Sequence, residues 1–212
     1  MDIENFRREY LAGGLKAEDL LADPVAQFNL WLGQTVESGL KDPTAMVVAT
    51  VGNDGQPSQR IVLLKHVDQD GFVFYTNYGS RKAEEIEDNN RVSLLFAWNA
   101  LDRQVKICGH AEKVSAADSL KYFLSRPRDS QLAAWASQQS RKISGRDFLM
   151  TQLAHMKEKC REGEVPLPDF WGGFRIKPYE IEFWQGGEHR LHDRFVYELQ
   201  DNQSWTIHQL AP

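Results

Sequence analysis

A hydroxyl and two cations follow one another in Gly79-Ser80-Arg81-Lys82, between an apolar, strand-like segment and a segment with helical character. The N-terminus of a helix presents unpaired backbone N–H groups and the positive end of the helix dipole, and both attract an anion. Ser, Arg and Lys side chains at the same end add further donors. This run therefore predicts a phosphate cradle. The alternative is a capped surface helix whose charges are solvated.

A phenol, a guanidinium and a second hydroxyl recur at intervals of four residues in Tyr122, Arg126 and Ser130. Residues four apart share a face of a helix, so Tyr122 and Arg126 point the same way. Pro127 ends that helix and turns the chain toward Ser130. The three side chains together suit a second phosphate, and the alternative is an ordinary helix end.

The segment WQGGEHRLHDR, from Trp184 to Arg194, contains a third group of candidate residues. If HRLHDRF is a strand, Arg190, His192 and Arg194 lie on one face at intervals of roughly 6.6 Å. Two guanidinium groups and an imidazole would then line one wall of a site. The alternative is a solvated edge strand.

Arg60 and Lys65 lie in one predicted strand, SQRIVLLKHV, five residues apart. An odd separation places two side chains on opposite faces of a regular strand. Both residues can serve one site only if a bulge, a strong twist or a backbone contact intervenes. The pair is therefore a test of whether the strand is regular.

Charge and missing motifs exclude several classes of protein. The 25 basic and 30 acidic residues give a net charge of -5, which argues against nucleic acid as a partner. No apolar run approaches the roughly 18 residues of a membrane span and the first residues are charged, so we expect a cytoplasmic protein without membrane contact.

Dinucleotide-binding, P-loop and nucleophile-elbow motifs are absent from the sequence. Cys108, Cys160 and the scattered histidines have no ligand spacing, so we expect no metal.

Helical patterns occur at four places. Asp23 and Pro24 are a typical cap and first residue, and the next apolar residues recur at intervals of three and four. This spacing predicts a buried face formed by Val25, Phe28, Leu32 and Val36. Further helices are expected to begin at Ser80, Ser115 and Ser144, because Ser is a favoured N-cap residue.

Strand patterns dominate the remainder. Five β-branched and aromatic runs, separated by Asn, Asp and Gly, lie between Ala45 and Val114, and three or four more follow Phe170, with a turn expected at Pro178. Long helical crossovers are few, which disfavours a parallel sheet. The sequence predicts one α+β domain over residues 1–212, with an antiparallel, closed or nearly closed β-barrel surrounded by helices.

Five strings occur in order along the chain: RIVLLK from Arg60, YTNYGSRK from Tyr75, SRPRDSQ from Ser125, FWGGFR from Phe170, and WQGGEHRLHDR. RREY at Arg7 and LAP at Leu210 extend the series to nearly the whole chain. In this order the strings resemble the pyridoxamine 5'-phosphate oxidase family. The resemblance implies a homodimeric, FMN-binding split barrel with FMN sites at the subunit interface.

The resemblance also implies a division of the candidate residues between two ligands. FMN would be bound by Arg60, Ile61, Val62, Leu63, Leu64, Lys65, Tyr75, Thr76, Arg81, Lys82, Gln104, Gln139, Ser140, Trp184 and Arg194. The substrate would be bound by Lys65, Tyr122, Arg126, Ser130, Arg190, Leu191 and His192, and by Arg7, Arg8, Glu9 and Tyr10 of an N-terminal flap within residues 1–20. Arg190 and His192 would be the catalytic pair.

The implied reaction is the oxidation of pyridoxamine 5'-phosphate and pyridoxine 5'-phosphate to pyridoxal 5'-phosphate, with O2 as acceptor and hydrogen peroxide as product. The amine substrate also releases ammonia. Such catalysis consists mainly of positioning the substrate against the flavin and placing charge near it. Two alternatives stay open: a non-catalytic protein that binds FMN or pyridoxal phosphate, and a split-barrel flavin reductase. The intact Arg190 and His192 disfavour the first, and the Tyr122 group disfavours the second.

One segment departs from the family. After Gly13-Gly14 the chain reads Leu15-Lys16-Ala17-Glu18, where the family has a more basic run. If that run binds a second, regulatory pyridoxal phosphate, this chain is expected to bind it weakly.

Overall fold

The computed structural model describes residues 9–10 and 13–212. Its helices are α1 (Pro24–Glu37), α2 (Arg81–Asp88), α3 (Ala116–Ser125), α4 (Arg128–Ala136) and α5 (Arg146–Lys159), with short 3-10 helices η1 (Ala17–Asp19), η2 (Asn99–Leu101) and η3 (Glu188–Arg190). Its strands are β1 (Ala45–Val51), β2 (Pro57–Leu63), β3 (His66–Asp68), β4 (Gly71–Asn77), β5 (Arg91–Trp98), β6 (Arg103–Lys113), β7 (Trp171–Gln185), β8 (Asp193–Leu199) and β9 (Trp205–Leu210).

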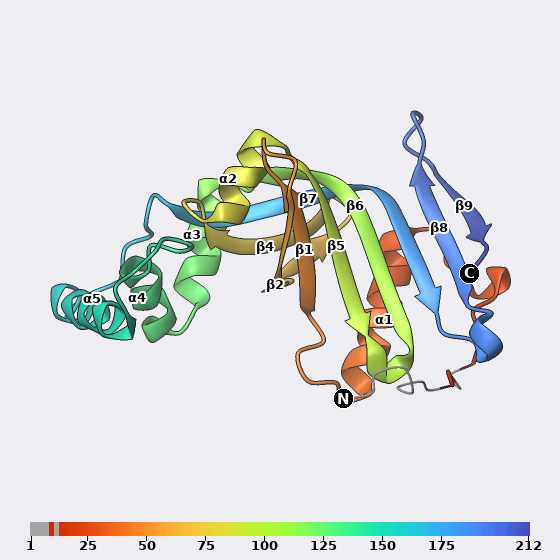
Figure 1. The fold of residues 1–212 in the computed structure, drawn as a ribbon, viewed down its shortest axis with the longest axis horizontal. Coiled ribbons are helices and arrows are strands. Elements are labelled where there is room, and N and C mark those ends of the chain that lie inside the picture. Colours follow the sequence, from red (N-terminus) through yellow and green to blue (C-terminus); the bar gives the residue numbers. More distant parts are fainter. Residues whose placement is uncertain (1–8, 11–12) are drawn as a thin grey trace.

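All strands belong to one antiparallel sheet. The order along it is β2-β1-β5-β6-β7-β4-β3, and β8 pairs with β7 and β9. The sheet curls strongly, with α1 against its concave side, while α3, α4 and α5 gather at one end of the molecule and β8 and β9 at the other (Figure 1). The predicted α+β class and split-barrel architecture are confirmed.

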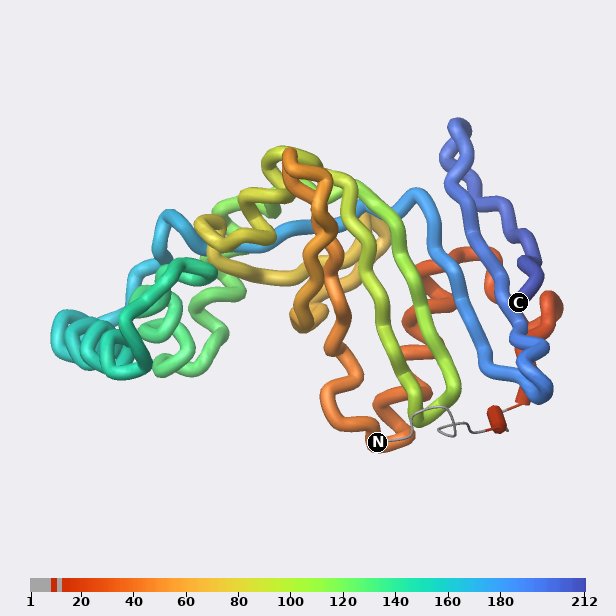
Figure 2. The backbone as a smooth tube through the Cα atoms, viewed as in Figure 1, coloured from red at the N-terminus to blue at the C-terminus, as the bar shows by residue number. Residues whose placement is uncertain are grey.

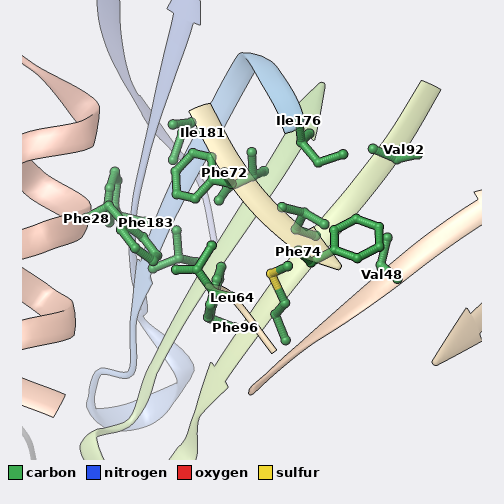
Figure 3. Close-up of a cluster of buried hydrophobic side chains, with 14 of the residues drawn as sticks. Phe28, Val48, Leu64, Phe72, Phe74, Val92, Phe96, Ile176, Ile181 and Phe183 are labelled. Atoms are coloured by element: carbon green, nitrogen blue, oxygen red, sulfur yellow. The ribbon is translucent and has the colours of Figure 1, made fainter. Parts of the chain in front are cut away.

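Aromatic side chains fill the interior of the curled sheet. Phe28 of α1 lies edge-on to Phe72 at a centroid distance of 4.9 Å, and at the same distance from Phe96. Figure 3 shows Phe28, Phe72, Phe96 and Phe183 converging from the helix and from separate strands. Burying each such ring contributes about 1.5 to 3 kcal/mol, so α1 is fixed against the sheet. A second, smaller cluster around Phe123 and Trp171 joins the helical end to β7.

Helix α1 begins as predicted, because Asp23 accepts a hydrogen bond from the Val25 N–H at 2.9 Å and Pro24 is its first residue. Its predicted face is partly wrong: Val36 is 55% exposed, whereas Trp31 and Thr35 are buried. The buried face is rotated toward Trp31 because the side chain packs on Phe183 at 5.2 Å.

The other predicted helix starts vary in accuracy. Ser115 caps α3 by accepting from the Asp118 N–H at 3.0 Å. Ser80 occupies the N-cap position of α2 but makes no capping bond. Gly145, rather than Ser144, precedes the first residue of α5. No helix predicted from the sequence corresponds to α4.

Two predicted strand boundaries are wrong. SQRIVLLKHV forms two strands, because β2 ends at Leu63 and the Lys65 N–H bonds to the carbonyl of Val73 in β4. There are thus six strands before Val114 instead of five. The expected turn at Pro178 is absent, since β7 continues through it.

The continuity of β7 depends on a β-bulge. Cys108 pairs with Glu180 and Gly109 with Pro178, so Tyr179 has no residue opposite it on β6. A proline is tolerated at such a bulge because a ladder N–H is not needed there. Any Cβ at Gly109 would lie 2.5 Å from the carbonyl oxygen of Lys177, so glycine is needed for this close approach.

Among the described residues, no helix is long and apolar enough to cross a membrane. Nor does any group of three or more His, Cys, Asp or Glu side chains in this part of the chain have the arrangement of a metal site.

Candidate active site

A cavity of about 980 Å³ lies between β2, β4, the start of α2, and the helices α3 and α4. This volume is at the upper end of the range for small-molecule sites, so it has room for more than one ligand group. Its lining residues are Ser58, Gln59, Arg60, Ile61, Val62, Leu63, Lys65, Tyr75, Thr76, Asn77, Arg81, Lys82, Tyr122, Arg126, Pro127, Ser130, Ala133, Ala134, Ser137, Gln139, Ser140 and Trp171.

Strand β2 forms one wall through its edge. It ends the sheet order and pairs with β1, and consecutive residues 58–63 all line the cavity. Because neighbouring side chains of a strand point to opposite faces, an unbroken lining run means that the cavity follows the strand edge. Backbone N–H and C=O groups along such an edge are available to a planar polar ligand.

Arg60 and Lys65 reach the same cavity although five residues separate them. The strand is interrupted between them: the buried Leu64 donates its N–H to the Thr44 carbonyl at 2.9 Å, and Lys65 donates to Val73 at 2.8 Å. The chain thus changes its pairing partner at Leu64. This break is the backbone irregularity that the sequence required.

A buried carboxylate, Glu85, lies behind two of the cavity's arginines. Its Oε2 accepts from Thr50 Oγ1 and Ser58 Oγ, both at 2.5 Å, and lies 3.3 Å from Arg60 Nη2. Its Oε1 accepts from Arg81 Nε at 2.6 Å. Burial opposes ionisation, but the hydrogen bonds from the two hydroxyls and from Arg81 outweigh it and lower the pKa of Glu85 to about 2. Glu85 is therefore a permanent anion that fixes both guanidinium groups.

Lys82 is buried at the same end of the cavity without a carboxylate contact among its described partners. Its Nζ lies 3.1 Å from Thr76 Oγ1, 3.3 Å from Ser80 Oγ and 3.0 Å from Gln139 Oε1. Burial, with a smaller contribution from the charge of Arg60, lowers the pKa of Lys82 to about 8. A buried ammonium with neutral partners is costly, and an anion bound beside it would remove that cost.

Arg126 lies at the other end of the cavity, against aromatic faces. Its Cζ is 4.7 Å from the centroid of Trp171 and 5.8 Å from that of Phe123. Its Nη1 is buried and has no hydrogen-bond partner among the described residues. Burial lowers the pKa of Arg126 below its usual value. An unpaired buried donor of this kind is rare and is expected to bind an acceptor from a ligand.

The cavity as a whole is suited to anions. Five cations line it, namely Arg60, Lys65, Arg81, Lys82 and Arg126, and the lining residues that the structure describes include no Asp or Glu. Two cationic ends, joined by a strand edge and aromatic rings, suit anionic groups such as phosphates on ligands with planar rings.

A second group of predicted residues lies across three neighbouring strands. Gln104 of β6 pairs with Trp184 of β7, which pairs with Arg194 of β8. The His192 ring lies 4.7 Å from the Trp184 ring, and Tyr10 meets both rings edge-on at 5.7 and 5.4 Å. None of these five residues lines the cavity described above.

The predicted strand alternation of Arg190, His192 and Arg194 is wrong. Arg190 belongs to η3 and has a φ of 63°, and β8 begins only at Asp193. The Leu191 N–H closes this turn by donating to the Glu188 carbonyl at 2.9 Å, and the Gly187 N–H donates to His192 Nδ1 at 3.2 Å. Arg194 instead donates from Nε to Glu182 at 2.8 Å and from Nη1 to the Ala211 carbonyl at 2.8 Å.

The described structure thus divides the predicted site residues into two sets. The cavity collects Arg60, Ile61, Val62, Leu63, Lys65, Tyr75, Thr76, Arg81, Lys82, Tyr122, Arg126, Ser130, Gln139 and Ser140. The second set is Gln104, Trp184, Arg190, Leu191, His192 and Arg194, with Tyr10 beside it. Leu64 is in the hydrophobic core, Glu9 is exposed, and Arg7 and Arg8 lie outside the described residues.

Of the residues at the site that were not predicted, Glu85 and Trp171 make the contacts described above with the arginines. Glu85 follows Arg81 by four residues on α2, a spacing from which the ion pair could have been read. Trp171 begins β7 and lines the cavity far from the other cavity residues in sequence. Sequence spacing carries no signal for such a long-range contact.

Fold and cavity together define a split-barrel protein with a cavity lined by five cations. Residues 32–160 match the family model described as pyridoxamine 5'-phosphate oxidase, and residues 171–212 match that of the pyridoxine 5'-phosphate oxidase C-terminal dimerisation region. Proteins named pyridoxine/pyridoxamine 5'-phosphate oxidase from Teredinibacter turnerae and Vibrio parahaemolyticus are 61% and 59% identical over 100% of both chains. The chain belongs to the pyridoxamine 5'-phosphate oxidase family.

Solved structures agree with this fold. The PhzG protein of Burkholderia lata, solved with tetrahydrophenazine-1-carboxylic acid, superimposes with a TM-score of 0.87 at 28% identity, covering 93% of this chain and 98% of that chain. A pyridoxamine 5'-phosphate oxidase-related, FMN-binding protein of Nostoc punctiforme gives a TM-score of 0.73 at 14% identity, with coverages of 91% and 100%. The second likeness supports the fold alone.

Proposed function

We propose that this protein oxidises pyridoxamine 5'-phosphate and pyridoxine 5'-phosphate to pyridoxal 5'-phosphate, with FMN as cofactor and O2 as acceptor. Hydrogen peroxide is released with both substrates and ammonia with the amine. Full-length relatives at about 60% identity that carry this activity in their names support the proposal. The structural observation that carries it is the cavity with two cationic ends and no lining carboxylate among the described residues.

The two ends are assigned to two phosphates. Arg60, Arg81 and Lys82 would hold the FMN phosphate at the start of α2, where helix N–H groups and the dipole add to the side chains. Tyr122, Arg126 and Ser130, with Lys65, would hold the phosphate of the substrate. Bound FMN supplies the two-electron chemistry that no protein side chain offers.

The distance along β7 supports a site made by two copies of the chain. Trp171 at its start lines the cavity and Trp184, thirteen residues later, belongs to the second set. A fully extended strand of that length spans at most roughly 40 Å, and β7 bends within the curled sheet (Figure 1). Figure 2 shows the chain passing from the helical end toward β8 over this stretch. One chain therefore keeps the two sets apart, and a homodimer would bring the second set of one copy to the cavity of the other.

In this arrangement Arg190 and His192 act on the substrate. His192 Nδ1 accepts the Gly187 N–H at 3.2 Å, so a neutral His192 carries its proton on Nε2 and donates from there. Arg190 is exposed at the tip of η3, and its guanidinium is free to contact a ligand of a second copy. Both groups would orient the substrate and hold a proton near its reacting carbon.

Two further assignments are part of the proposal. The unbridged Cys108 and Cys160 suit a reducing compartment such as the cytoplasm. The assignment of residues 1–20 as a flap over the substrate is the second, and residues 1–8 and 11–12 lie outside the described residues. The packing of Tyr10 on Trp184 and His192 supports this role for the described part of that segment.

An aerobic assay of the FMN-loaded protein with each phosphorylated vitamer tests the function. Pyridoxal 5'-phosphate and hydrogen peroxide should appear in equal amounts. A yellow protein that produces neither would be a binding protein instead. Bleaching of the flavin by NADPH without oxygen, in the absence of vitamer oxidation, would identify a flavin reductase.

Two substitutions test the assignment of roles. Arg190→Ala should lower turnover by roughly a hundredfold or more while FMN affinity stays unchanged, as for the loss of a group that stabilises the transition state. Lys82→Ala should weaken FMN binding roughly tenfold to a hundredfold, because a charged hydrogen bond to phosphate is lost. Steady-state kinetics at saturating FMN and equilibrium flavin titration separate the two effects. Equal effects of both substitutions on both quantities would contradict the assignment.

A further inference from the structure

Trp171 is one of three nearly parallel aromatic rings at one end of the cavity. Its ring is nearly parallel to Tyr75, at 5.5 Å and 11°, and to Tyr122, at 6.1 Å and 7°. Tyr75 and Tyr122 stack on each other at 4.0 Å and 18°. The indole is only 7% exposed, and Phe123 packs edge-on against it at 5.2 Å. The position and tilt of Trp171 are thus fixed by β4 and α3.

The Arg126 guanidinium rests on this ring, with Cζ 4.7 Å from the indole centroid. No carboxylate pairs with Arg126 among the ion pairs of the described residues. Its Nη1 is removed from solvent and makes no hydrogen bond within the described part of the chain. Arg126 is thus held through its face, and its in-plane donors are free.

This mode of contact has a consequence for ligand binding. A carboxylate takes up two N–H groups of a guanidinium when it binds in the bidentate manner. An aromatic face attracts the cation through its quadrupole and takes up none of them. A guanidinium that packs on a ring therefore has its in-plane N–H groups available to a phosphate. Its charge has no anionic partner until the phosphate binds.

We propose that Trp171 is a positioning residue that determines the affinity of the substrate site for phosphate by holding Arg126 on its face with the N–H groups unoccupied. Trp171 itself does not take part in the reaction. The proposal rests on the proposed function for the identity of the substrate, and on the geometry alone for the binding of phosphate.

Three variants of the FMN-loaded enzyme test the proposal. Trp171→Leu removes the ring and Trp171→Phe keeps a smaller one. Trp205→Leu on β9 removes a tryptophan outside the cavity and is the control, compared at a protein concentration at which all variants have the same oligomeric state. For Trp171→Leu, KM for pyridoxine 5'-phosphate should rise roughly tenfold while kcat changes less than about twofold, which matches the loss of a desolvated cation–π contact. Trp171→Phe should recover most of the loss, and Trp205→Leu should leave KM unchanged.

Calorimetric titration with inorganic phosphate provides a readout that needs no turnover. FMN occupies its own phosphate site, so the titration reports the Arg126 end of the cavity. Affinity should fall roughly tenfold in Trp171→Leu and recover in Trp171→Phe. If the wild-type protein oxidises neither vitamer, the proposed function fails, and this titration still decides the role of Trp171.

A double-mutant cycle covers the case in which Trp171→Leu folds poorly. Trp171→Met also removes the ring but keeps more of its bulk than leucine does, so it should weaken phosphate binding roughly tenfold when Arg126 is present. In an Arg126→Ala background it should have no further effect on phosphate affinity, because the cation that Trp171 positions is gone. An equal effect of Trp171→Met with and without Arg126 would overturn the proposal. The proposal would also be overturned if Trp171→Leu lowered kcat and FMN affinity by the same factor as it lowers phosphate affinity.

Discussion

The two ends of the cavity hold their arginines by opposite means. Arg60 and Arg81 are tied from behind to the buried carboxylate of Glu85, whereas Arg126 lies on the face of Trp171. The carboxylate neutralises part of the charge and occupies some of the donors. The aromatic face does neither. A cofactor that stays bound needs a rigid cradle, and a substrate that must enter and leave on each turnover needs donors that are available at once.

Removal of Glu85 is the most disruptive way to test this difference. Glu85→Leu should lower the free energy of unfolding by about 2 to 3 kcal/mol, less than for a fully buried pair because the Arg81 side chain is 55% exposed. FMN affinity should fall by about tenfold as the guanidinium groups lose their fixed positions, while riboflavin, which has no phosphate, should bind almost as before. Denaturant titration and flavin titration measure the two effects.

Glu84→Leu is the matched control for Glu85→Leu. Glu84 is the neighbouring residue, but its ion pair with Arg141 is on the surface, with side chains 46% and 56% exposed. Such a pair contributes about 0 to 1 kcal/mol, so stability and FMN affinity should hardly change. If Glu85→Leu weakened riboflavin binding as much as FMN binding, Glu85 would support the whole cavity and not the phosphate cradle.

A smaller effect is expected from pH, and only at the Lys82 end. Burial lowers the pKa of Lys82 to about 8, so before FMN binds this side chain loses its charge as the pH rises through that value. The phosphate of FMN stays doubly charged above about pH 7. FMN affinity should therefore fall roughly tenfold from pH 7 to pH 9, since the lysine must take up a proton on binding. Flavin titration across this range measures the slope.

The same pH series separates the two ends of the cavity. Lys82→Gln should remove the slope, because no titrating cation is left there. Binding of inorganic phosphate at Arg126 should not weaken from pH 7 to pH 9, because a guanidinium does not titrate in this range and the phosphate only gains negative charge. A parallel decline at both ends would show that a common event, such as a change in the fold, governs both.

Local sequence patterns were sufficient to predict many helices and strands and part of the site. A strand followed by Gly79 and Ser80 and a helix correctly indicated the cationic helix start that lines the cavity. Tyr122 of α3 and Arg126, the residue that directly follows this helix, do face the same cavity. In both cases the signal is the periodicity of one element, which the chain carries locally.

The errors arose where tertiary contacts override local pattern. Pro178 resembles a turn signal, but the bulge opposite Gly109 accommodates it within β7. The strand predicted through His192 is interrupted because η3 turns the backbone at Arg190. Trp171 meets Arg126 across the fold, and no spacing within either element encodes that contact.

The length of β7 has a consequence for assembly. If each site combines the cavity of one copy with the Trp184 end of another, flavin affinity depends on protein concentration. Thermodynamic linkage then requires the reverse as well: bound flavin must strengthen the association of the two chains by the same free energy. A single β-strand, by keeping its two ends apart, would thus make cofactor loading and subunit assembly one coupled equilibrium.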